Sequence, residues 1–560
     1  MPLQIRGAHA ALARRIFAAA LTLIVAIGVC LATQDNTSAS IRAARTQRLN
    51  ATIQNVYTDG YQRMKHDELV AARNAQDRTI DNIYTAVNPY GTDTTALYVY
   101  FTTEDAATVR YIVHADGYPD YSAQPAKDSA ASTRHEFLVM GLVPGVSNTV
   151  TLTIDGPDGD SDTRTLTVNG PKLLGEEDVR LEASVPMDDD TVTALGQGLF
   201  AIIGNESNEQ DFTPLYDANG VIRAEIPLVD YRWDRLLEDK ANGLVWYTAN
   251  SNMLVALDTV GRAARILSIG ERFSIHHDIA LDENGDIVAL ATANNTADKS
   301  EMDRVIRIDA HTGKVRELVN LSSMFAQYKA KTKRVGYGGS DATWDWIHVN
   351  TIQLTADGGA LLSSRETSTI IKIDDIEGTP KLGYMIGTPA VWRGTPWEQS
   401  HLTKVGDFPD SGGQHSITVV RDPSLPDGQY YLYMFDNNLG KSETRPGFDW
   451  AAAIKGVNTV DSLDAVESSG ATSQFRRYLV DENARTYREV KQFDVPYSPY
   501  VSSVQELGDG RVLVDSGMQG VFGVYDESGS LLGQYKVKLT GAFGLVYRVY
   551  DYDMAAFFLG

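Results

Sequence analysis

The feature that most constrains the fold is a sequence pattern typical of β-hairpins, which recurs from about residue 174 to the end of the chain. At each occurrence a polar turn precedes an apolar strand, as at Asn219-Gly220, Asn242-Gly243, Asn284-Gly285, Asp357-Gly358 and Asp509-Gly510. Asn-Gly and Asp-Gly favour tight hairpin turns. Recurrence about every 45–60 residues, with roughly four strands each time, is typical of propeller blades. We therefore expect residues 173–560 to form a β-propeller of about six blades.

The region before the propeller changes character twice. Residues 34–80 have roughly helical apolar spacing and predict a lead-in helix. Residues 81–172 follow a period of two, with short apolar runs between turn-rich segments, which predicts about seven short strands. That pattern is typical of a small β-sandwich of the immunoglobulin or fibronectin kind. The fold class we expect is therefore all-β, with a six-bladed propeller behind a small sandwich and an N-terminal helix.

The N-terminus is typical of an export signal. Arg6, Arg14 and Arg15 precede an apolar run over residues 16–32, and a polar stretch follows. We interpret residues 1–33 as a signal peptide or an N-terminal membrane anchor, and the sequence leaves open whether the segment is cleaved. Either outcome places the body outside the cytoplasm, as a periplasmic, secreted or outward-facing anchored protein.

Charge and cysteine content restrict the function classes. The chain has 50 basic and 73 acidic residues and a formal net charge of -23, which repels phosphate backbones, so nucleic acid is not an expected partner. An anionic substrate would need a local cationic pocket. Cys30 is the single cysteine, which excludes an internal disulfide and a cysteine-based metal site.

Three of the ten histidines share one place in the repeat. The segments that contain His277, His348 and His415 each lead into the innermost strand of a blade. Equivalent positions of successive blades converge on the propeller axis, so we expect these side chains to meet there. His276 adjoins His277, and strand alternation lets only one of the two face the channel.

Further polar residues have positions that suit the same axial point. Arg365 ends the strand after His348 and offers a planar cationic fork, although pairing with a neighbouring acid is the other interpretation. Asn350 is two residues after His348 and should share its face. Tyr500 and Ser502 precede the inner strand of the last blade and could add hydroxyl donors.

Two chemistries suit three histidines, an asparagine and an arginine. Imidazole is a common metal ligand, but the only carboxylate in register, Asp278, points away from His277, and Arg365 would lie unfavourably beside a dication. The alternative is transfer of an anionic group, in which arginine, asparagine and histidine hold the oxygens and a neutral imidazole attacks. Trp344, Trp346, Trp392 and Trp397 could line an aromatic pocket or pack in the core.

At these residues the chain resembles the bacterial arylsulfate sulfotransferase family. The motifs that carry the resemblance are Asn88-Pro89-Tyr90-Gly91, His276-His277-Asp278, Asp345-Trp346-Ile347-His348-Val349-Asn350, Ser363-Ser364-Arg365, Gly413-Gln414-His415 and Phe435-Asp436-Asn437. Their order and spacing are specific when taken together, and they extend over most of the chain after the predicted signal.

The resemblance implies sulfo transfer from an aryl sulfate donor to a phenol, with ping-pong kinetics and no adenylylated sulfate or other cofactor. His415 matches the transiently sulfated histidine. His277, His348, Asn350 and Arg365 match residues that hold the sulfo group, and His348 is a candidate for proton transfer. Some members carry a disulfide near the site, which the lone Cys30 excludes here. Members can form homodimers through the N-terminal domain, but the sequence leaves the oligomeric state open.

Two other functions fit the sequence pattern. A secreted, non-catalytic propeller would bind aryl sulfates or glycans without turning them over. A metal-dependent propeller hydrolase or lactonase would lose its activity on chelation. The physiological donor and acceptor do not follow from the sequence.

Overall fold

The computed structural model describes residues 44–175, 177–205, 212–230, 234–336, 339–462, 470–539 and 544–560. Two compact units are present, residues 1–55 and residues 56–560. The predicted signal peptide or anchor, including its apolar run over residues 16–32, lies outside the described residues. Among those that are described, no helix is long and apolar enough to cross a membrane.

The predicted lead-in helix is interrupted. Residues 44–56 are helical, and a second helix, α2 (Asp59–Arg73), begins after Thr58. The Thr58 hydroxyl accepts a hydrogen bond from the backbone N–H of Tyr61, 3.3 Å away, which is an N-cap contact. The apolar spacing predicted one helix, whereas the structure has two, and the second begins at this cap.

The sandwich is a six-stranded sheet organised around one long strand. Its strands are β1 (Tyr84–Val87), β2 (Leu97–His114), β3 (Tyr121–Ala123), β4 (Ser132–Val139), β5 (Ser147–Asp155) and β6 (Ser161–Asn169). The first half of β2 pairs with β1 and β4, and its second half pairs with β3 and β5. The strand β2 is continuous over 18 residues, where the sequence pattern predicts only short strands.

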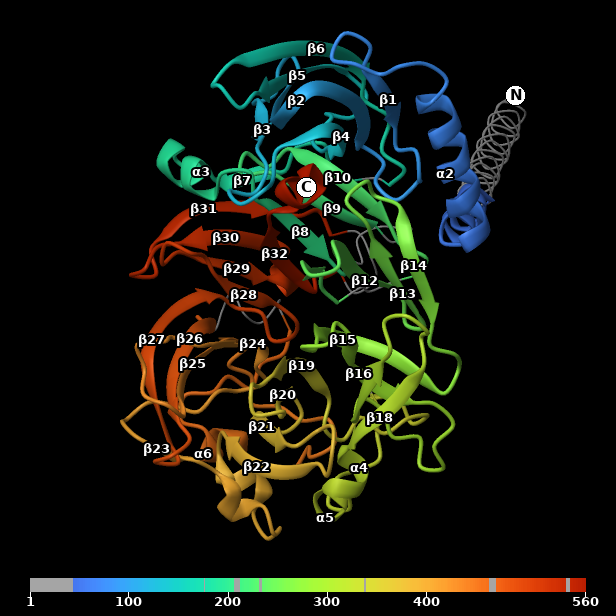
Figure 1. Cartoon of the computed structure of the whole chain (residues 1–560). Coiled ribbons are helices and arrows are strands. Elements are labelled where there is room, and N and C mark those ends of the chain that lie inside the picture. The colour runs from blue at the N-terminus through green and yellow to red at the C-terminus, as the bar shows by residue number, and fades with distance from the viewer. Residues whose placement is uncertain are drawn as a thin grey trace, which may run out of the picture. The chain divides into compact units, whose positions relative to one another are not determined.

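Six sheets of four or five strands follow, which confirms the propeller (Figure 1). Blade 1 contains β8 (Leu199–Ile203), β9 (Phe212–Tyr216), β10 (Ile222–Pro227) and β32 (Arg548–Tyr552). Blade 2 contains β11 (Leu237–Asp239), β12 (Leu244–Asn250), β13 (Met253–Leu257) and β14 (Ala263–Ser268). Blade 3 contains β15 (Phe273–Leu281), β16 (Ile287–Ala293), β17 (Arg304–Ile308) and β18 (Val315–Asn320).

The other three blades follow in chain order. Blade 4 contains β19 (Val349–Leu354), β20 (Ala360–Ser364), β21 (Thr369–Asp374) and β22 (Lys381–Ile386). Blade 5 contains β23 (Thr403–Lys404), β24 (His415–Val420), β25 (Gln429–Asp436), β26 (Thr472–Asp481) and β27 (Thr486–Pro496). Blade 6 contains β28 (Ser503–Glu506), β29 (Val512–Ser516), β30 (Val521–Tyr525), β31 (Leu531–Lys536) and β7 (Glu182–Val185).

Strands from the two ends of this region close the ring. The C-terminal strand β32 pairs with β8, so it forms the inner edge of blade 1, and β7 adds an outer strand to blade 6. The inner strands β15, β19, β24, β28 and β32 contact one another in succession around the centre (Figure 1). This closure brings residues near the C-terminus to the same axis as the three histidines.

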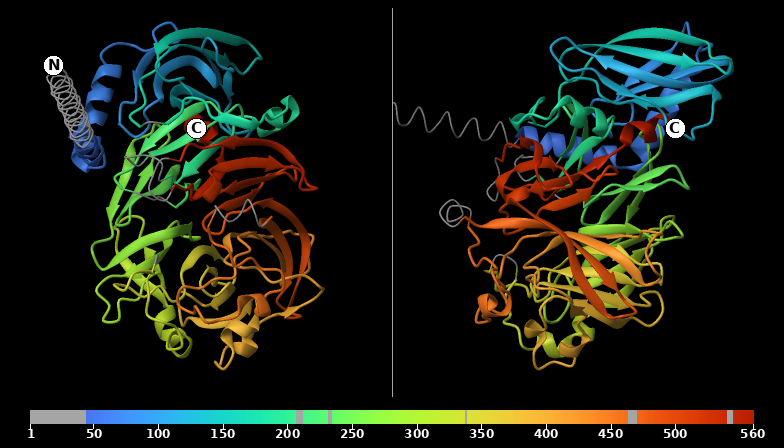
Figure 2. Two further views of the ribbon diagram at one scale, coloured as in Figure 1. Left: turned by 180° about the vertical axis from the view of Figure 1, so that it is seen from behind. Right: turned by 90° about the vertical axis from the view of Figure 1, so that its left-hand side faces the viewer.

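Short helices occupy several connections between strands, and one follows the last strand. They are α3 (Asp189–Leu195), α4 (Leu321–Met324), α5 (Ala326–Lys329), α6 (Trp450–Ala453), α8 (Met554–Leu559), and the 3-10 turns η2 (Pro389–Trp392), η3 (Glu398–Ser400) and η5 (Gly517–Gln519). The last of the α-helices, α8, lies against β4 of the sandwich (Figure 2).

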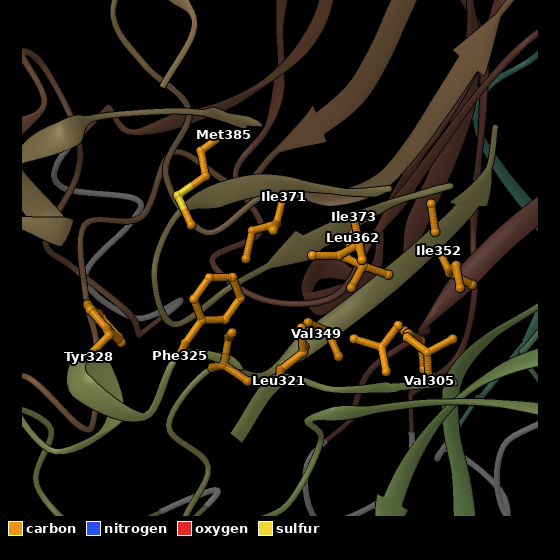
Figure 3. Close-up of a cluster of buried hydrophobic side chains, with 14 of the residues drawn as sticks. Val305, Leu321, Phe325, Tyr328, Val349, Ile352, Leu362, Ile371, Ile373 and Met385 are labelled. Atoms are coloured by element: carbon orange, nitrogen blue, oxygen red, sulfur yellow. The ribbon is translucent and has the colours of Figure 1, made fainter. Parts of the chain in front are cut away.

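A hydrophobic cluster between blades 3 and 4 holds the inner strand that follows His348. Val349 and Ile352 of β19 are fully buried there, next to Val305 of blade 3 and Leu362 of blade 4 (Figure 3). A fully buried aliphatic side chain contributes about 1.5–3 kcal/mol. The start of β19 is therefore fixed by apolar packing on both neighbouring blades.

Candidate active site

Irregular strand pairing shapes the site in three consecutive blades. In β15 the register shifts between Ile275 and Ile279, so that three residues face a single residue of β16. Shifts also occur in β19, between Val349 and Thr351, and in β24, after His415. Such bulges re-aim side chains and are common next to active sites.

The backbone is strained at these same places. His277, His348 and Ser416 have φ angles of 59°, 47° and 54°, in the left-handed region that non-glycine residues rarely adopt. Each such residue costs about 1–3 kcal/mol and tends to occur where function requires a fixed direction. The strained position thus falls on two of the three predicted histidines, His277 and His348, and on the residue that follows the third.

His415 is buried, with 3% of its surface exposed, and its orientation is fixed by two acceptors. Nδ1 lies 2.7 Å from Oδ1 of Asn437 and 3.0 Å from the carbonyl oxygen of Gly413. The Asn437 amide cannot be reversed, because its nitrogen donates to the carbonyls of Ser498 and Val501 at 2.8 and 3.0 Å. Nδ1 must therefore carry the proton, and Nε2 keeps its lone pair.

The surroundings also keep the His415 ring neutral. Burial is the main cause that lowers its pKa to about 3; the hydrogen bond to Asn437 opposes this shift, and the nearby His348, Arg365 and Arg548 assist it. A neutral imidazole with Nε2 unprotonated is the form that can act as a nucleophile.

His348 is paired with a buried acid. Its Nδ1 lies 2.5 Å from Oδ2 of Asp345, and the same oxygen is 3.4 Å from the guanidinium of Arg365. Burial raises the pKa of Asp345 to about 7, although the Arg365 charge lowers it. The pair can therefore hold or release a proton near neutrality, which suits acid–base work.

The two adjacent histidines do not obey strand alternation. Nδ1 of His276 and Nδ1 of His277 are 2.9 Å apart, because the bulge in β15 turns both rings to the same side. The His277 ring centre is 4.8 Å from that of His348 and 5.5 Å from that of Tyr547. The His277 ring therefore lies next to His348 and Tyr547. Strand alternation does not separate the two histidines, and the resemblance to the family pattern remains the reason to assign His277 to the site.

The contacts of Arg365 are compatible with both interpretations from the sequence, namely a cation at the site and a partner of a neighbouring acid. It pairs with Glu366 at 2.9 Å and with Asp345, and it also lines a cleft of about 130 Å³. The cleft is lined by Arg365, Glu366, Gly413, Leu439, Lys441, Glu443 and Tyr500. The Arg365 guanidinium lies 5.6 Å from the centre of the Tyr500 ring. The cleft therefore has a cationic and an aromatic side chain on its surface. Its lining also includes Gly413, which stands two residues before His415 in the chain.

Asn350 and Ser502 have structural contacts that the sequence did not indicate. The bulge after Val349 breaks the alternation, and the fully buried Asn350 amide donates to the carbonyl of Gln414 at 2.9 Å, directly before His415. The Ser502 hydroxyl donates to Ser498 and accepts from the backbone of Gly517. The expectation that Ser502 offers its hydroxyl to a substrate is thus corrected, because that hydroxyl is buried and engaged in the loop.

The tryptophans belong to the core and not to the pocket. Trp346 and Trp392 are fully buried in the cluster between blades 3 and 4, and Trp344 and Trp397 pack against it. Among the residues that the structure describes, no group of three or more His, Cys, Asp or Glu side chains is arranged to hold a metal ion.

Comparison with known protein families identifies both parts of the chain. The model of the arylsulfotransferase (ASST) family matches residues 185–540, and the model of the arylsulfotransferase Ig-like domain matches residues 84–171. The chain belongs to the arylsulfotransferase family. The predicted resemblance is thereby confirmed, and the chain is a sulfotransferase.

A search of curated proteins gave no match to this arylsulfotransferase. Solved structures similar to it include a protein of unknown function from Bacteroides caccae, with 10% identity, a TM-score of 0.35, and coverage of 63% of this chain and 98% of that one. A putative 6-phosphogluconolactonase from Bacteroides fragilis has 12% identity, a TM-score of 0.33, and coverage of 80% and 99%. A streptogramin B lyase has 11% identity, a TM-score of 0.30, and coverage of 60% and 87%.

Several residues of the arylsulfotransferase site went unassigned in the sequence. Asn437 and Asp345 stand in the motifs that carry the family resemblance, but their contacts with His415 and His348 depend on long-range geometry. Tyr547 and Arg548 reach the axis only because β32 closes blade 1. That strand contains no histidine and no Asn-Gly or Asp-Gly turn, so the sequence did not indicate that it reaches the axis.

Proposed function

We propose that this arylsulfotransferase transfers a sulfo group from an aryl sulfate to a phenol in two half-reactions, with a sulfohistidine on His415 between them. The single observation that carries the proposal is the pair of hydrogen bonds that hold the His415 Nδ1 proton, since they leave Nε2 as the nucleophilic atom. The low pKa of the ring, about 3, keeps it unprotonated at neutral pH.

In the first half-reaction, Nε2 of His415 attacks sulfur. The N–S bond forms as the S–O bond to the aryl group breaks, and the phenolate leaves with its electron pair. Arg365 and His277 compensate the charge on the sulfo oxygens, as preorganised donors do in other transfer reactions. His348, supported by Asp345, gives a proton to the departing oxygen when the phenol is a poor leaving group.

In the second half-reaction, an acceptor phenol enters the same cleft. Its oxygen attacks sulfur, the N–S bond breaks, and His415 recovers the lone pair on Nε2. The phenolic proton passes to His348. It replaces the proton that His348 gave to the first leaving group, or, where that phenolate left unprotonated, His348 releases it to solvent. No cofactor is consumed, and ping-pong kinetics follow because the first product leaves before the acceptor binds.

The shape and chemistry of the cleft support small phenolic substrates. Tyr500 and Leu439 provide an apolar and aromatic wall. Arg365 and Lys441 provide cationic groups in the same lining, where each is paired with an acid, Glu366 and Glu443. Aromatic rings stack favourably on such a wall. We further propose that the enzyme works outside the cytoplasm, which rests on the basic and apolar order of residues 1–33 alone.

The test is direct labelling. The full chain is incubated with 4-nitrophenyl sulfate without an acceptor, and peptide mass analysis should locate one sulfo group on His415. His415→Asn should abolish both the label and phenol sulfation, whereas His311→Asn, at an exposed hairpin position, should retain both. Transfer by His415→Asn at the wild-type rate would disprove the assignment of the nucleophile.

Two further measurements distinguish the sulfotransferase from the two other functions that fit the sequence. Binding of the aryl sulfate without label or turnover would favour a non-catalytic propeller. Loss of activity after treatment with a chelator, with recovery on adding a divalent metal, would favour the metal-dependent hydrolase. We expect turnover that is unaffected by the chelator.

A further inference from the structure

A buried cluster of charged side chains joins three inner strands of the propeller and the segment that leads into a fourth. It consists of Asp278 in β15, Arg548 in β32 and Arg235 just before β11, and we call it the axial clamp. Asp278 and Arg548 are fully buried, and the Arg235 side chain is 18% exposed. Buried charges are costly unless they are paired and hydrogen-bonded.

The Asp278 carboxylate is the centre of the clamp. Its Oδ1 accepts from Nη1 of Arg548 at 2.9 Å and from Nε of Arg235 at 2.6 Å. Its Oδ2 accepts from Nη2 of Arg235 at 3.0 Å and from the backbone N–H of Ile352, in β19, at 2.9 Å. One carboxylate therefore links blades 1, 3 and 4 to the entry of blade 2.

Arg548 extends these links to the backbone. Its Nη1 also donates to the carbonyl of Asp234 at 3.1 Å, and its Nη2 donates to the carbonyl of Asn350 at 2.8 Å. The Arg548 guanidinium carbon lies 4.9 Å from the centre of the Tyr547 ring. That ring is in turn 6.5 Å from the centre of the His415 ring.

The clamp residues adjoin the site residues along the chain. Asp278 follows His277, Arg548 follows Tyr547, and Asn350 stands two residues after His348. Two guanidinium groups share one carboxylate, so the clamp carries one excess positive charge in a buried place. Such a charge attracts an anion more strongly than the same charge in water would.

We propose that Arg548 is a positioning residue for sulfo transfer: with Asp278 it fixes the strands that carry His277 and Asn350, and it supplies a buried positive charge that favours an anionic sulfate at the site. This inference rests on the proposed function for the identity of the ligand. It adds a contribution from the closing strand β32 to a site whose other residues come from blades 3, 4 and 5 and from the loop that precedes blade 6.

Binding is tested first, in a form that does not need the covalent step. On the His415→Asn background, the Kd of 4-nitrophenyl sulfate is measured by calorimetry with and without Arg548→Gln. We expect Kd to rise about tenfold, as for loss of one charge about 10 Å from an anion at an effective dielectric constant of about 20. Arg548→Lys, which keeps the charge, should recover most of the affinity.

A matched control separates charge from stability. Arg223 is also fully buried and is paired with Asp217 at 2.7 Å, but it lies in β10, away from the histidines. Arg223→Gln should lower Tm and leave Kd unchanged. An equal Kd for the Arg548→Gln and parent proteins, or equal weakening by Arg548→Lys and Arg548→Gln, would overturn the proposal.

Asp278→Asn is a second test, in which donor affinity should change in the opposite direction. It can replace Arg548→Gln if that variant does not fold. Loss of the carboxylate leaves both guanidinium charges uncompensated, so the KM of the sulfate donor should fall while the rate of His415 labelling falls with the loosened strands. A purely structural role predicts no decrease in KM. If wild-type protein binds the sulfate but is not labelled, the proposed function is wrong. The comparison of Kd values with and without Arg548→Gln still shows whether the axial clamp favours binding of the anion.

Discussion

Asn437 accepts a 2.7 Å hydrogen bond from Nδ1 of His415 while its own amide nitrogen donates to two backbone carbonyls. The amide is thus locked by the loop that precedes β28, and it locks the imidazole in turn. Residues from blade 5 and from the loop that precedes blade 6 therefore determine together which nitrogen of His415 carries the proton. A histidine whose tautomer is imposed from outside needs no proton shift before it attacks.

Replacement of Asn437 tests this relationship. Asn437→Ala should slow sulfo labelling of His415 about 10- to 100-fold, because a supporting contact is lost while the carbonyl of Gly413 still accepts the Nδ1 proton. The KM of the donor should change little. The measurement is a rapid-quench labelling assay, with Asn458→Ala as the control, since that amide bonds to Thr472 and not to His415. Equal labelling rates in the wild type and Asn437→Ala would show that tautomer control is unimportant.

Labelling should also be insensitive to mild acid. Burial depresses the pKa of His415 to about 3, so the neutral ring predominates at every pH above that value. A solvent-exposed histidine has a pKa near 6.5 and would lose about 30-fold in its neutral fraction between pH 8 and pH 5. With 4-nitrophenyl sulfate, whose leaving group needs little protonation, the labelling rate should stay nearly constant over that range. A fall that is half complete near pH 6.5 would contradict the buried, neutral ring.

The sequence predicted what local chemistry determines. Asp-Gly and Asn-Gly hairpins indicated the repeated blades, because turn geometry depends on the residues in the turn. The expectation that His277, His348 and His415 converge on the axis was drawn from ring symmetry alone. Alternation failed at His276 and Asn350 because bulges depend on pairing between strands, which a single strand does not reveal. The contribution of Arg548 was hidden for a similar reason, since its strand pairs with one that lies more than three hundred residues earlier.

The aromatic wall of the cleft should control donor affinity. The Tyr500 ring faces the Arg365 guanidinium, and its hydroxyl donates to Asp461 at 3.3 Å. Tyr500→Ala should raise the donor KM about tenfold, because stacking and cation–π contacts of ~0.5–1.5 kcal/mol each are lost. Tyr500→Phe keeps the ring and serves as the matched control, with a KM close to that of the wild type. Equal KM values for Tyr500→Ala and the wild type would place the substrate elsewhere.

Asp515 should make the fold less stable as the pH rises. The side chain is buried in β29 of blade 6, and neither carboxyl oxygen has a hydrogen-bond partner among the described residues. Burial raises its pKa well above the usual range. The folded chain therefore keeps this proton after the unfolded chain has released it, which begins near pH 4. From there up to the folded pKa, the group removes about 1.4 kcal/mol of unfolding free energy for each pH unit.

Asp515→Asn removes the ionisation and keeps the size of the side chain. Urea unfolding at pH 5, 6 and 7 should therefore show the variant gaining on the wild type with each step, whereas the two should be close near pH 4. Asp526→Asn is the control of opposite sign, because hydrogen bonds from Ser528 and Ser530 lower the pKa of that exposed carboxylate. Its loss should not favour the variant as the pH rises. A stability difference for Asp515→Asn that is the same at every pH would mean that the carboxyl group is already ionised in the folded blade.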